Sequence, residues 1–130
     1  MTHFDVQDAL ESLTVLIDTR EHVDTPGFQR RAAHFPRWRR EKLDVGDYSA
    51  ELTASEQKCR IPVAIERKMS IDELCQCFSR ERARFMREFE RAKANGTRFY
   101  LIVERATWED LFAGRYRRRL NSKALLESLL

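Results

Sequence analysis

The chain has 130 residues, 42% of them hydrophobic and 35% charged, which suits one domain with an ordinary core and excludes a fully disordered chain. No apolar run approaches the roughly 18 residues that a membrane-spanning helix needs. Lys and Arg number 24 against 21 Asp and Glu, giving a net charge of +3, and 19 of the 24 are Arg. Because Arg binds phosphate through a planar two-point fork, this bias hints at a phosphate partner, although genomic GC bias explains it equally well.

Short apolar segments in the first half of the chain predict four β-strands, at residues 14–18, 42–47, 48–53 and 60–66. Residues 1–13 predict a polar lead-in or a short helix. Residues 19–38 are rich in turn formers and arginine, which predicts a loop with a short helical piece.

The spacing of apolar residues changes to that of a helix after residue 70. Ser70 and Glu73 form a capping box, so a helix is predicted to start at Ile71, and Asn95-Gly96 provides its end. Residues 99–103 predict another strand, residues 107–114 a short helix, and Ser122 the start of a last helix. Strands that alternate with helices predict an α/β fold, in which helices flank a mixed central sheet.

The three cysteines, Cys59, Cys75 and Cys77, cannot all pair, and the N-terminus carries no secretory signal. Reduced thiols in a cytosolic protein are therefore expected. Cys75 and Cys77 lie two residues apart in a predicted helix and do not face each other, so buried thiols are expected there rather than a zinc site.

Carboxylates adjoin three of the predicted strands. Asp18 follows Val-Leu-Ile, Glu66 follows Val-Ala-Ile, and Asp47 follows Gly46 in a turn. A carboxylate beside a buried strand is unfavourable unless a basic partner or a metal ion compensates it. For any one acid, an ion pair or an exposed strand end is the better explanation. Three such acids in one small domain favour a shared ligand site, because strand ends converge in open α/β sheets.

Glu66 and Lys68 lie two residues apart in an extended strand, so they project to one side while Arg67 projects away. A Glu that binds a divalent metal, beside a Lys that orients or deprotonates a water, is a hydrolytic pair. Asp47 would supply the second ligand of a hard cation such as Mg²⁺, which takes one or two carboxylates together with water and substrate phosphate. Such a metal would activate the water and offset the repulsion between these acids and a phosphodiester.

Gly46-Asp47, Glu66-Arg67-Lys68 and Asp72 together resemble the PD-(D/E)xK signature of restriction-endonuclease-like folds. The full pattern resembles that of the XPF-type structure-selective endonucleases, which include the archaeal Hef nuclease. Residues 16–21 resemble the family's first strand with its Asp-x-Arg-Glu element, and residues 43–48 resemble its second motif. The resemblance covers roughly residues 14–130 and implies one nuclease domain over residues 1–130 with a restriction-endonuclease-like α/β fold.

The resemblance implies a role for each matching residue. Asp47 and Glu66 would be the principal ligands of Mg²⁺ or Mn²⁺, with Asp18 as a further acid of the site. The backbone carbonyl of Arg67 would complete the coordination. Lys68 would position the water or stabilise the developing charge.

Other residues of the motifs have less defined roles. Arg67 and Asp72 belong to the catalytic motif, but Asp72, at the second position of a predicted helix, would serve equally well to compensate the helix dipole. Arg20 and Glu21 are expected to form a local ion pair that orders the site.

Contacts to DNA are expected from clusters of basic residues. The loop cluster is Arg30, Arg31, Arg37, Arg39 and Arg40 with Trp38 as a stacking group, and the C-terminal cluster is Arg115, Arg117, Arg118 and Arg119. A third set, Arg80, Arg84, Arg87 and Arg91, has helical spacing, but Glu81, Glu88 and Glu90 interleave with it and favour a solvated helix face. We therefore expect phosphate contacts from the loop and C-terminal clusters, and binding that weakens steeply with salt.

The sequence carries no tandem helix-hairpin-helix domain, which XPF-type enzymes usually have. It ends on bare leucines in residues 124–130, so either the chain is cut there or this apolar face packs elsewhere. The resemblance also implies a homodimer or heterodimer formed through the nuclease domain.

Three functions compete. The leading one is a Mg²⁺- or Mn²⁺-dependent DNA endonuclease that cuts near branches such as flaps and forks, in the cytoplasm or nucleoid, or in the nucleus of a eukaryote. The second is a non-catalytic DNA-binding subunit, against which the intact Asp47, Glu66 and Lys68 argue. The third is an Arg-rich nucleic-acid-binding module with paired acids, which would bind without divalent ions and never cut.

Overall fold

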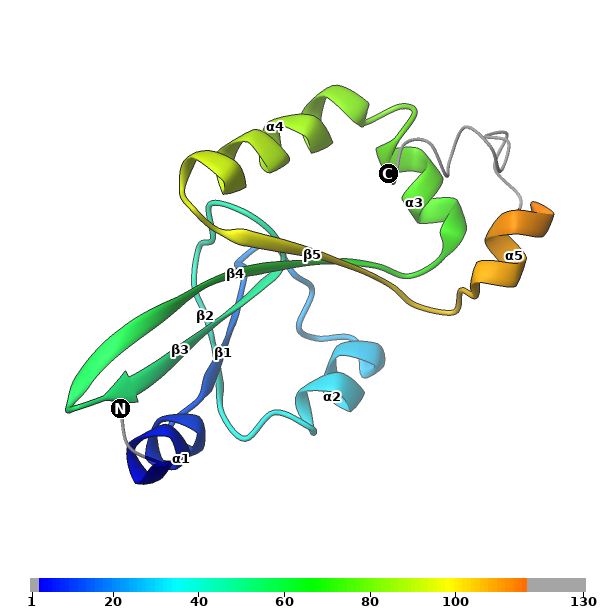
Figure 1. Cartoon of the computed structure of the whole chain (residues 1–130). Coiled ribbons are helices and arrows are strands. Elements are labelled where there is room, and N and C mark those ends of the chain that lie inside the picture. Colours follow the sequence, from blue (N-terminus) through cyan, green and yellow to red (C-terminus); the bar gives the residue numbers. More distant parts are fainter. Residues whose placement is uncertain (1–2, 117–130) are drawn as a thin grey trace.

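The structure is a computed structural model that describes residues 3–116, with side chains from Val6 onward (Figure 1). The helices are α1 (His3–Glu11), α2 (Pro26–Ala32), α3 (Ile71–Cys77), α4 (Arg82–Ala94) and α5 (Trp108–Ala113). The strands are β1 (Thr14–Ile17), β2 (Trp38–Arg40), β3 (Tyr48–Ala54), β4 (Gln57–Lys68) and β5 (Arg98–Val103).

The strands form one five-stranded mixed sheet in the order β2-β1-β3-β4-β5. The β1–β2 and β4–β5 pairs are parallel, whereas β3 is antiparallel to both β1 and β4. Helices α3 and α4 lie on one side of the sheet and α2 lies on the other (Figure 1). This arrangement confirms the predicted α/β fold with a mixed central sheet flanked by helices.

The alternation along β4 decides which residues face which layer. Ala64 packs with Ala92 of α4, whereas Ile65 packs against the cluster around Phe28 of α2. Since side chains of a strand point alternately to opposite faces, Glu66 and Lys68 share the α3–α4 side, and Arg67 faces the α2 side.

Three predicted helix boundaries are confirmed. Ser70 caps α3 by accepting from Glu73 N–H, and Thr107 caps α5 by accepting from Asp110 N–H. Asn95 caps the end of α4, and the following Gly96 has the left-handed φ of +65° that glycine adopts readily. These boundaries depend on contacts within a few residues, which explains why sequence alone locates them.

The single long helix expected from residue 71 is wrong, because residues 78–81 divide it into α3 and α4. Ser79 Oγ donates to Cys75 O at 2.7 Å, and Glu81 N donates to Gln76 O instead of continuing the regular ladder. Such local side-chain bonds compete with helical ones. The break lets Phe78 meet Phe85 edge to face, with ring centroids 5.4 Å apart.

The strand expected at residues 42–47 is also wrong, since that segment is irregular and the neighbour of β1 is β2 at Trp38–Arg40. Leu43 N donates to the Asp18 carboxylate and not to a strand partner, at 2.8 Å. The segment thus carries buried residues without forming a ladder. The expected last helix from Ser122 lies outside the described residues.

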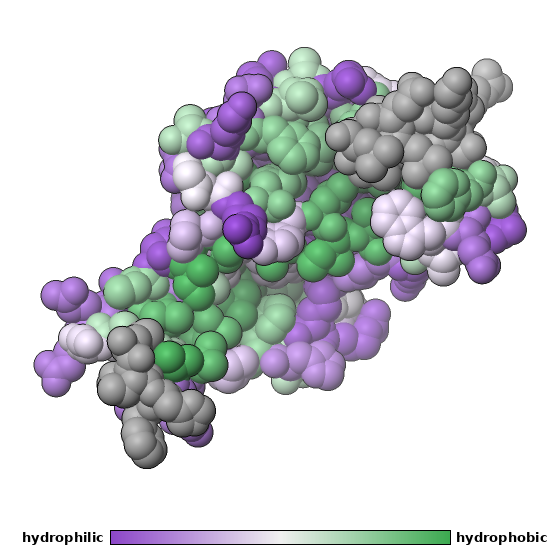
Figure 2. Space-filling view, viewed as in Figure 1, coloured by the Kyte–Doolittle hydropathy of each residue, from purple (hydrophilic) through white to green (hydrophobic). Residues whose placement is uncertain are grey.

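Hydrophobic side chains gather between the α3–α4 layer and β5, and hydrophilic ones follow the outer side of α4 (Figure 2). Phe78, Phe85 and Leu111 are buried there, with Phe99 and Leu101 of β5 packed against them. Within the described residues, no helix combines the length and the apolar character that crossing a lipid bilayer requires.

Candidate active site

Three segments of the chain meet at one end of the sheet. Asp18 directly follows β1, Asp47 directly precedes β3, and Glu66 lies near the end of β4. Asp18 N donates to Asp47 O at 2.9 Å, and Asp47 N donates to Ile65 O at 2.8 Å. Arg67 N in turn donates to the Asp47 carboxylate at 2.8 Å. The backbone therefore fixes Asp47 between β1 and β4.

Gly46 makes this placement of Asp47 sterically feasible. Its φ is +77°, and a Cβ at this position would lie 3.1 Å from both Ala64 Cβ and Ile65 O. Only glycine adopts this conformation freely and leaves room for the strand beside it. Gly46 N also donates to Glu88 Oε1 of α4 at 3.3 Å, which joins the turn to the helix above it.

Glu66 and Lys68 project to the same side of β4. Lys68 Nζ lies 3.3 Å from Glu66 Oε1 and also interacts with the thiol of Cys77 on α3. Burial alone would disfavour the ammonium form, but the Cys77 and Glu66 interactions outweigh it and raise the pKa of Lys68. Lys68 is therefore a cation that donates hydrogen bonds.

The two carboxylates of this cluster are held in an environment that disfavours their ionised forms. Burial raises the pKa of Glu66 to about 7, and the charges of Asp47 and Glu88 add to the effect. Burial also raises the pKa of Asp47 to about 6 against the lowering effect of the Arg67 N–H, and the charge of Glu21 raises it further. Burial and nearby acids thus disfavour the charge of both carboxylates, so both would gain from a bound cation.

The donor set suits a hard divalent cation. Mg²⁺ and Mn²⁺ prefer oxygen ligands, and Mg²⁺ commonly takes one or two carboxylates and completes its shell with water and phosphate oxygens. Within residues 3–116, no three His, Cys, Asp or Glu side chains are grouped as a metal site. The fit consequently depends on the two adjacent acids, Asp47 and Glu66, which are short of positive charge.

Asp18 is 1% exposed, and both of its oxygens have partners. Oδ1 accepts from Leu43 N at 2.8 Å and Oδ2 accepts from Arg20 Nε at 2.5 Å. Burial would raise the pKa of Asp18, but these hydrogen bonds outweigh burial and lower it. These contacts order the loop before β3, and the expected metal ligation by Asp18 stays a prediction.

Arg20 pairs with Asp18 and not with Glu21, contrary to expectation. Residues 18–21 form a turn, in which Glu21 N donates to Asp18 O at 3.0 Å and Arg20 folds back over Asp18. Glu21 turns away and accepts a hydrogen bond from the Tyr48 hydroxyl at 3.3 Å.

Arg67 points to the opposite face of the sheet, and its Nε and Nη2 donate to the two oxygens of Glu104 at 2.6 and 2.9 Å. Its side chain anchors β4 to the segment after β5. These contacts do not involve the backbone carbonyl of Arg67, and metal coordination through that carbonyl stays a prediction. Asp72 lies in the first turn of α3, where a carboxylate complements the helix N-terminus, and its catalytic role likewise stays a prediction.

Two side chains near the site are absent from the sequence prediction, Glu88 of α4 and Cys77 of α3. Both line a small cavity of about 30 Å³ together with Glu66 and Lys68. The one signal for Glu88 is its spacing, three residues after the buried Phe85, which places an acid at the edge of an apolar stripe. Cys77 carries no signal beyond its expected burial.

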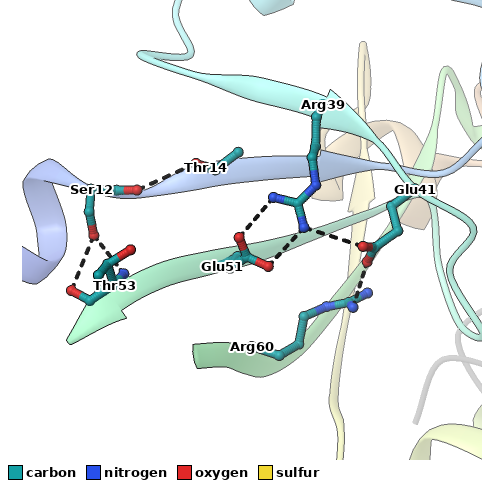
Figure 3. A network of polar contacts seen from close by, with 7 residues as sticks. All are labelled: Ser12, Thr14, Arg39, Glu41, Glu51, Thr53 and Arg60. Atoms are coloured by element: carbon teal, nitrogen blue, oxygen red, sulfur yellow. Dashed lines mark hydrogen bonds and ion pairs between the residues drawn. The ribbon is translucent and has the colours of Figure 1, made fainter. Parts of the chain in front are cut away.

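Arg39, one of the residues expected to contact DNA, instead forms ion pairs with Glu51 and Glu41 (Figure 3). Its two terminal nitrogens donate to the two oxygens of Glu51 at 2.8 Å each, and one also donates to Glu41 at 3.2 Å. Glu41 pairs in turn with Arg60 at 2.6 Å. This network links β2 to β3 across β1 and links the residue after β2 to β4, and it competes with phosphate for Arg39.

Other residues expected to contact DNA differ in their availability. Arg40 donates to the carbonyl oxygens of Thr19 and Glu21, and Arg115 pairs with Asp110 at 2.8 Å. Arg30 and Arg37 are exposed and Arg31 is half-buried, while Trp38 is 40% exposed and packs edge to face with Phe28. Arg117, Arg118 and Arg119 lie outside the described residues.

Comparison with known proteins adds an independent finding. The family model of the ERCC4 domain matches residues 17–130, nearly the whole chain. No curated protein gives a significant match. ERCC4 domains are XPF-type nuclease domains with a restriction-endonuclease-like fold, and the family acts on branched DNA. The chain, with its mixed sheet and its acids at the strand ends, therefore belongs to the ERCC4 domain family.

Proposed function

We propose that this domain is a Mg²⁺- or Mn²⁺-dependent DNA endonuclease that hydrolyses phosphodiester bonds at branched DNA such as flaps and forks. The observation that carries the proposal is the grouping of Asp47, Glu66 and Lys68 at one end of the sheet. The pKa values of both carboxylates are raised, and the charge of the Lys68 ammonium group acts on each of them. This combination suits a hard cation and a phosphate group together.

Asp47 and Glu66 would hold the cation through their carboxylate oxygens. A divalent cation bound there neutralises phosphate charge and lowers the pKa of the attacking water. Lys68 would donate a hydrogen bond to a phosphate oxygen or to that water. Because the pKa of Lys68 is raised, its proposed task is to stabilise developing negative charge and not to remove a proton.

The test uses labelled fork, flap and plain duplex DNA, incubated with Mg²⁺, Mn²⁺ or EDTA. Asp47→Asn and Glu66→Gln keep the shape of the side chain and remove its charge. Glu51→Gln is a matched control, since it makes the same change at an acid that binds Arg39 on the sheet. We expect cleavage by the wild type and the Glu51 variant only with a divalent ion, and no cleavage by the other two variants.

Equal cleavage by the wild type and the Asp47 and Glu66 variants would refute the assignment of the site. Binding of every substrate with no cleavage under any metal condition would favour the alternative, a non-catalytic DNA-binding subunit. An isothermal titration with Mn²⁺ separates these cases further, because the proposed site predicts metal binding that the Asp47→Asn variant lacks.

We also propose that residues 1–130 act as one nuclease domain and that this domain forms a homodimer or heterodimer. Sedimentation of the intact chain over a range of concentrations measures this assembly. A monomer at all concentrations would contradict the proposed dimer and leave the proposal for the acids intact.

A further inference from the structure

Arg84, Arg87 and Arg91 of α4 form a stripe along one side of the helix, and the sequence alone does not show that this stripe lies near the candidate site. Arg84, Arg87 and Arg91 are three and four residues apart, so they share one face of the helix. Glu88 lies four residues after Arg84 and three before Arg91, and therefore borders the same face. Because Glu88 reaches Gly46 N and its charge acts on both Asp47 and Glu66, this edge of the helix adjoins the site.

The first arginine of the stripe makes the connection directly. Arg84 lines the small cavity that Glu66 and Lys68 also line. Its side chain is 68% exposed, and within residues 3–116 its one acid partner is Glu81, at 3.8 Å. Such a long and exposed pair contributes little and is readily exchanged for a phosphate.

The other two arginines are available as well. Arg87 and Arg91 are exposed, and neither makes an ion pair with any residue of the described part of the chain. This distinguishes them from Arg39, Arg67 and Arg115, each of which is bound by a carboxylate. Of the acids that interleave with these arginines, Glu81 makes only the long pair with Arg84, Glu88 faces the site, and Glu90 forms no ion pair with the stripe in the described part of the chain.

We infer that Arg84, Arg87 and Arg91 form a track for the sugar–phosphate backbone of DNA, which leads a strand along α4 to the cluster of Asp47, Glu66 and Lys68. The inference depends on the proposed function for the position of the cut strand. The seven residue steps from Arg84 to Arg91 rise about 10 Å along the helix. A DNA strand carries one phosphate per roughly 3.4 Å of helix axis, so the stripe matches about three phosphates.

Electrostatic balance also favours this position for the track. The candidate site concentrates carboxylates, which repel a phosphodiester until a cation is bound. Guanidinium groups along the helix that borders the site would offset that repulsion and hold the strand by charge without reading its sequence. Arg39 and Arg40 of the loop cluster are less available for this purpose, because their guanidinium groups already have partners.

The test compares two double variants that remove the same charge from exposed positions. Arg87→Gln/Arg91→Gln removes two members of the track, and Arg30→Gln/Arg37→Gln removes two exposed arginines of the loop cluster. Fluorescence anisotropy with fork, flap and duplex DNA is measured in EDTA over a range of salt concentrations. Binding in EDTA does not require cleavage, so failure of the proposed catalytic function would not be mistaken for failure of the track.

We expect the α4 variant to bind all three DNAs about tenfold more weakly and to lower the salt slope of log K by about two, one per lost phosphate contact. The loop variant should retain most of the affinity. Arg87→Lys/Arg91→Lys should restore the slope, since it keeps the charge, and thus separates loss of charge from any disturbance of the helix. A wild-type slope in the α4 variant, with or without a loss in the loop variant, would overturn the inference, as would absence of DNA binding by the wild type.

Discussion

Replacing Glu66 by Gln should stabilise the metal-free protein, although it removes a residue of the candidate site. Burial and the charges of Asp47 and Glu88 raise the pKa of Glu66 from 4.5 to about 7. Between these two values the unfolded chain releases the proton first, so the free energy of unfolding falls as the pH rises. Above pH 7 the full penalty is present, and below pH 4.5 it is absent.

The size of the effect follows from the shift of about 2.5 pKa units. At about 1.4 kcal/mol per unit, the upper limit is about 3.5 kcal/mol at pH 8. Lys68 loses the charged partner that lies 3.3 Å away, so we expect a net gain of about 1–2 kcal/mol. For a domain of this size such a gain raises the melting temperature by several degrees.

Thermal unfolding of the wild type, Glu66→Gln and the control Glu51→Gln at pH 5 and pH 8 measures this prediction. The Glu66 variant should gain stability at pH 8 and little at pH 5, and added Mn²⁺ should stabilise the wild type and not this variant. The Glu51 variant should lose stability at both values. If Glu66→Gln is no more stable than the wild type at pH 8, the argument that burial penalises this carboxylate is wrong.

Three further predictions concern neighbouring residues. Lys68→Met should lower the cleavage rate about 10²- to 10³-fold and leave Mn²⁺ affinity, measured by calorimetry, within a few-fold, because Lys68 is a donor and not a ligand; unchanged cleavage would contradict this role. Gly46→Ala should destabilise the domain by about 1–3 kcal/mol in urea unfolding, because the residue has a φ of +77° and a Cβ would press on Ile65 O. Gly96→Ala is the control for the cost of a positive φ alone, since nothing lies within 4 Å of its Cβ. Equal losses of stability in the two variants would show that crowding at Gly46 is unimportant. A double-mutant cycle of Arg39→Met and Glu51→Gln should give a coupling free energy of unfolding of about 1 kcal/mol. Because this guanidinium is already bound by Glu51, DNA affinity should change little. A strong loss of DNA binding by Arg39→Met alone would show that Arg39 contacts DNA.

The features that sequence predicts well are those fixed by local physics. The cap at Ser70 and the end of the helix at Asn95 depend on hydrogen bonds within a few residues, and the structure has both. The opposite directions of Glu66 and Arg67 follow from the alternation of a strand, which needs no knowledge of the partner strands. For the same reason the motif around Glu66 could be interpreted before its surroundings were known.

The features that sequence predicts poorly depend on contacts between distant segments. No glycine or proline marks the helix break at Ser79 in the sequence. The contact that favours the break is the packing of Phe78 against Phe85, which lies in the next helix. The place of Trp38–Arg40 in the sheet depends on β1, about twenty residues earlier in the chain. The approach of Glu88 to Gly46, 42 residues away in sequence, appears only when α4 is packed on the sheet.

The pairing of acids elsewhere in this domain gives the strongest argument for a cation at the candidate site. Arginine is abundant, and Asp18, Glu51 and Glu104 each lie against an arginine that lowers the pKa of the carboxyl. The pKa values of Asp47 and Glu66 move in the opposite direction, although Lys68 lies within reach, because both carboxylates are buried and the charges of nearby acids add to that effect. The domain pairs those three carboxylates with arginine but forms no arginine ion pair with Asp47 or Glu66 among the described residues, and two buried acids with one nearby lysine attract a further cation from solution.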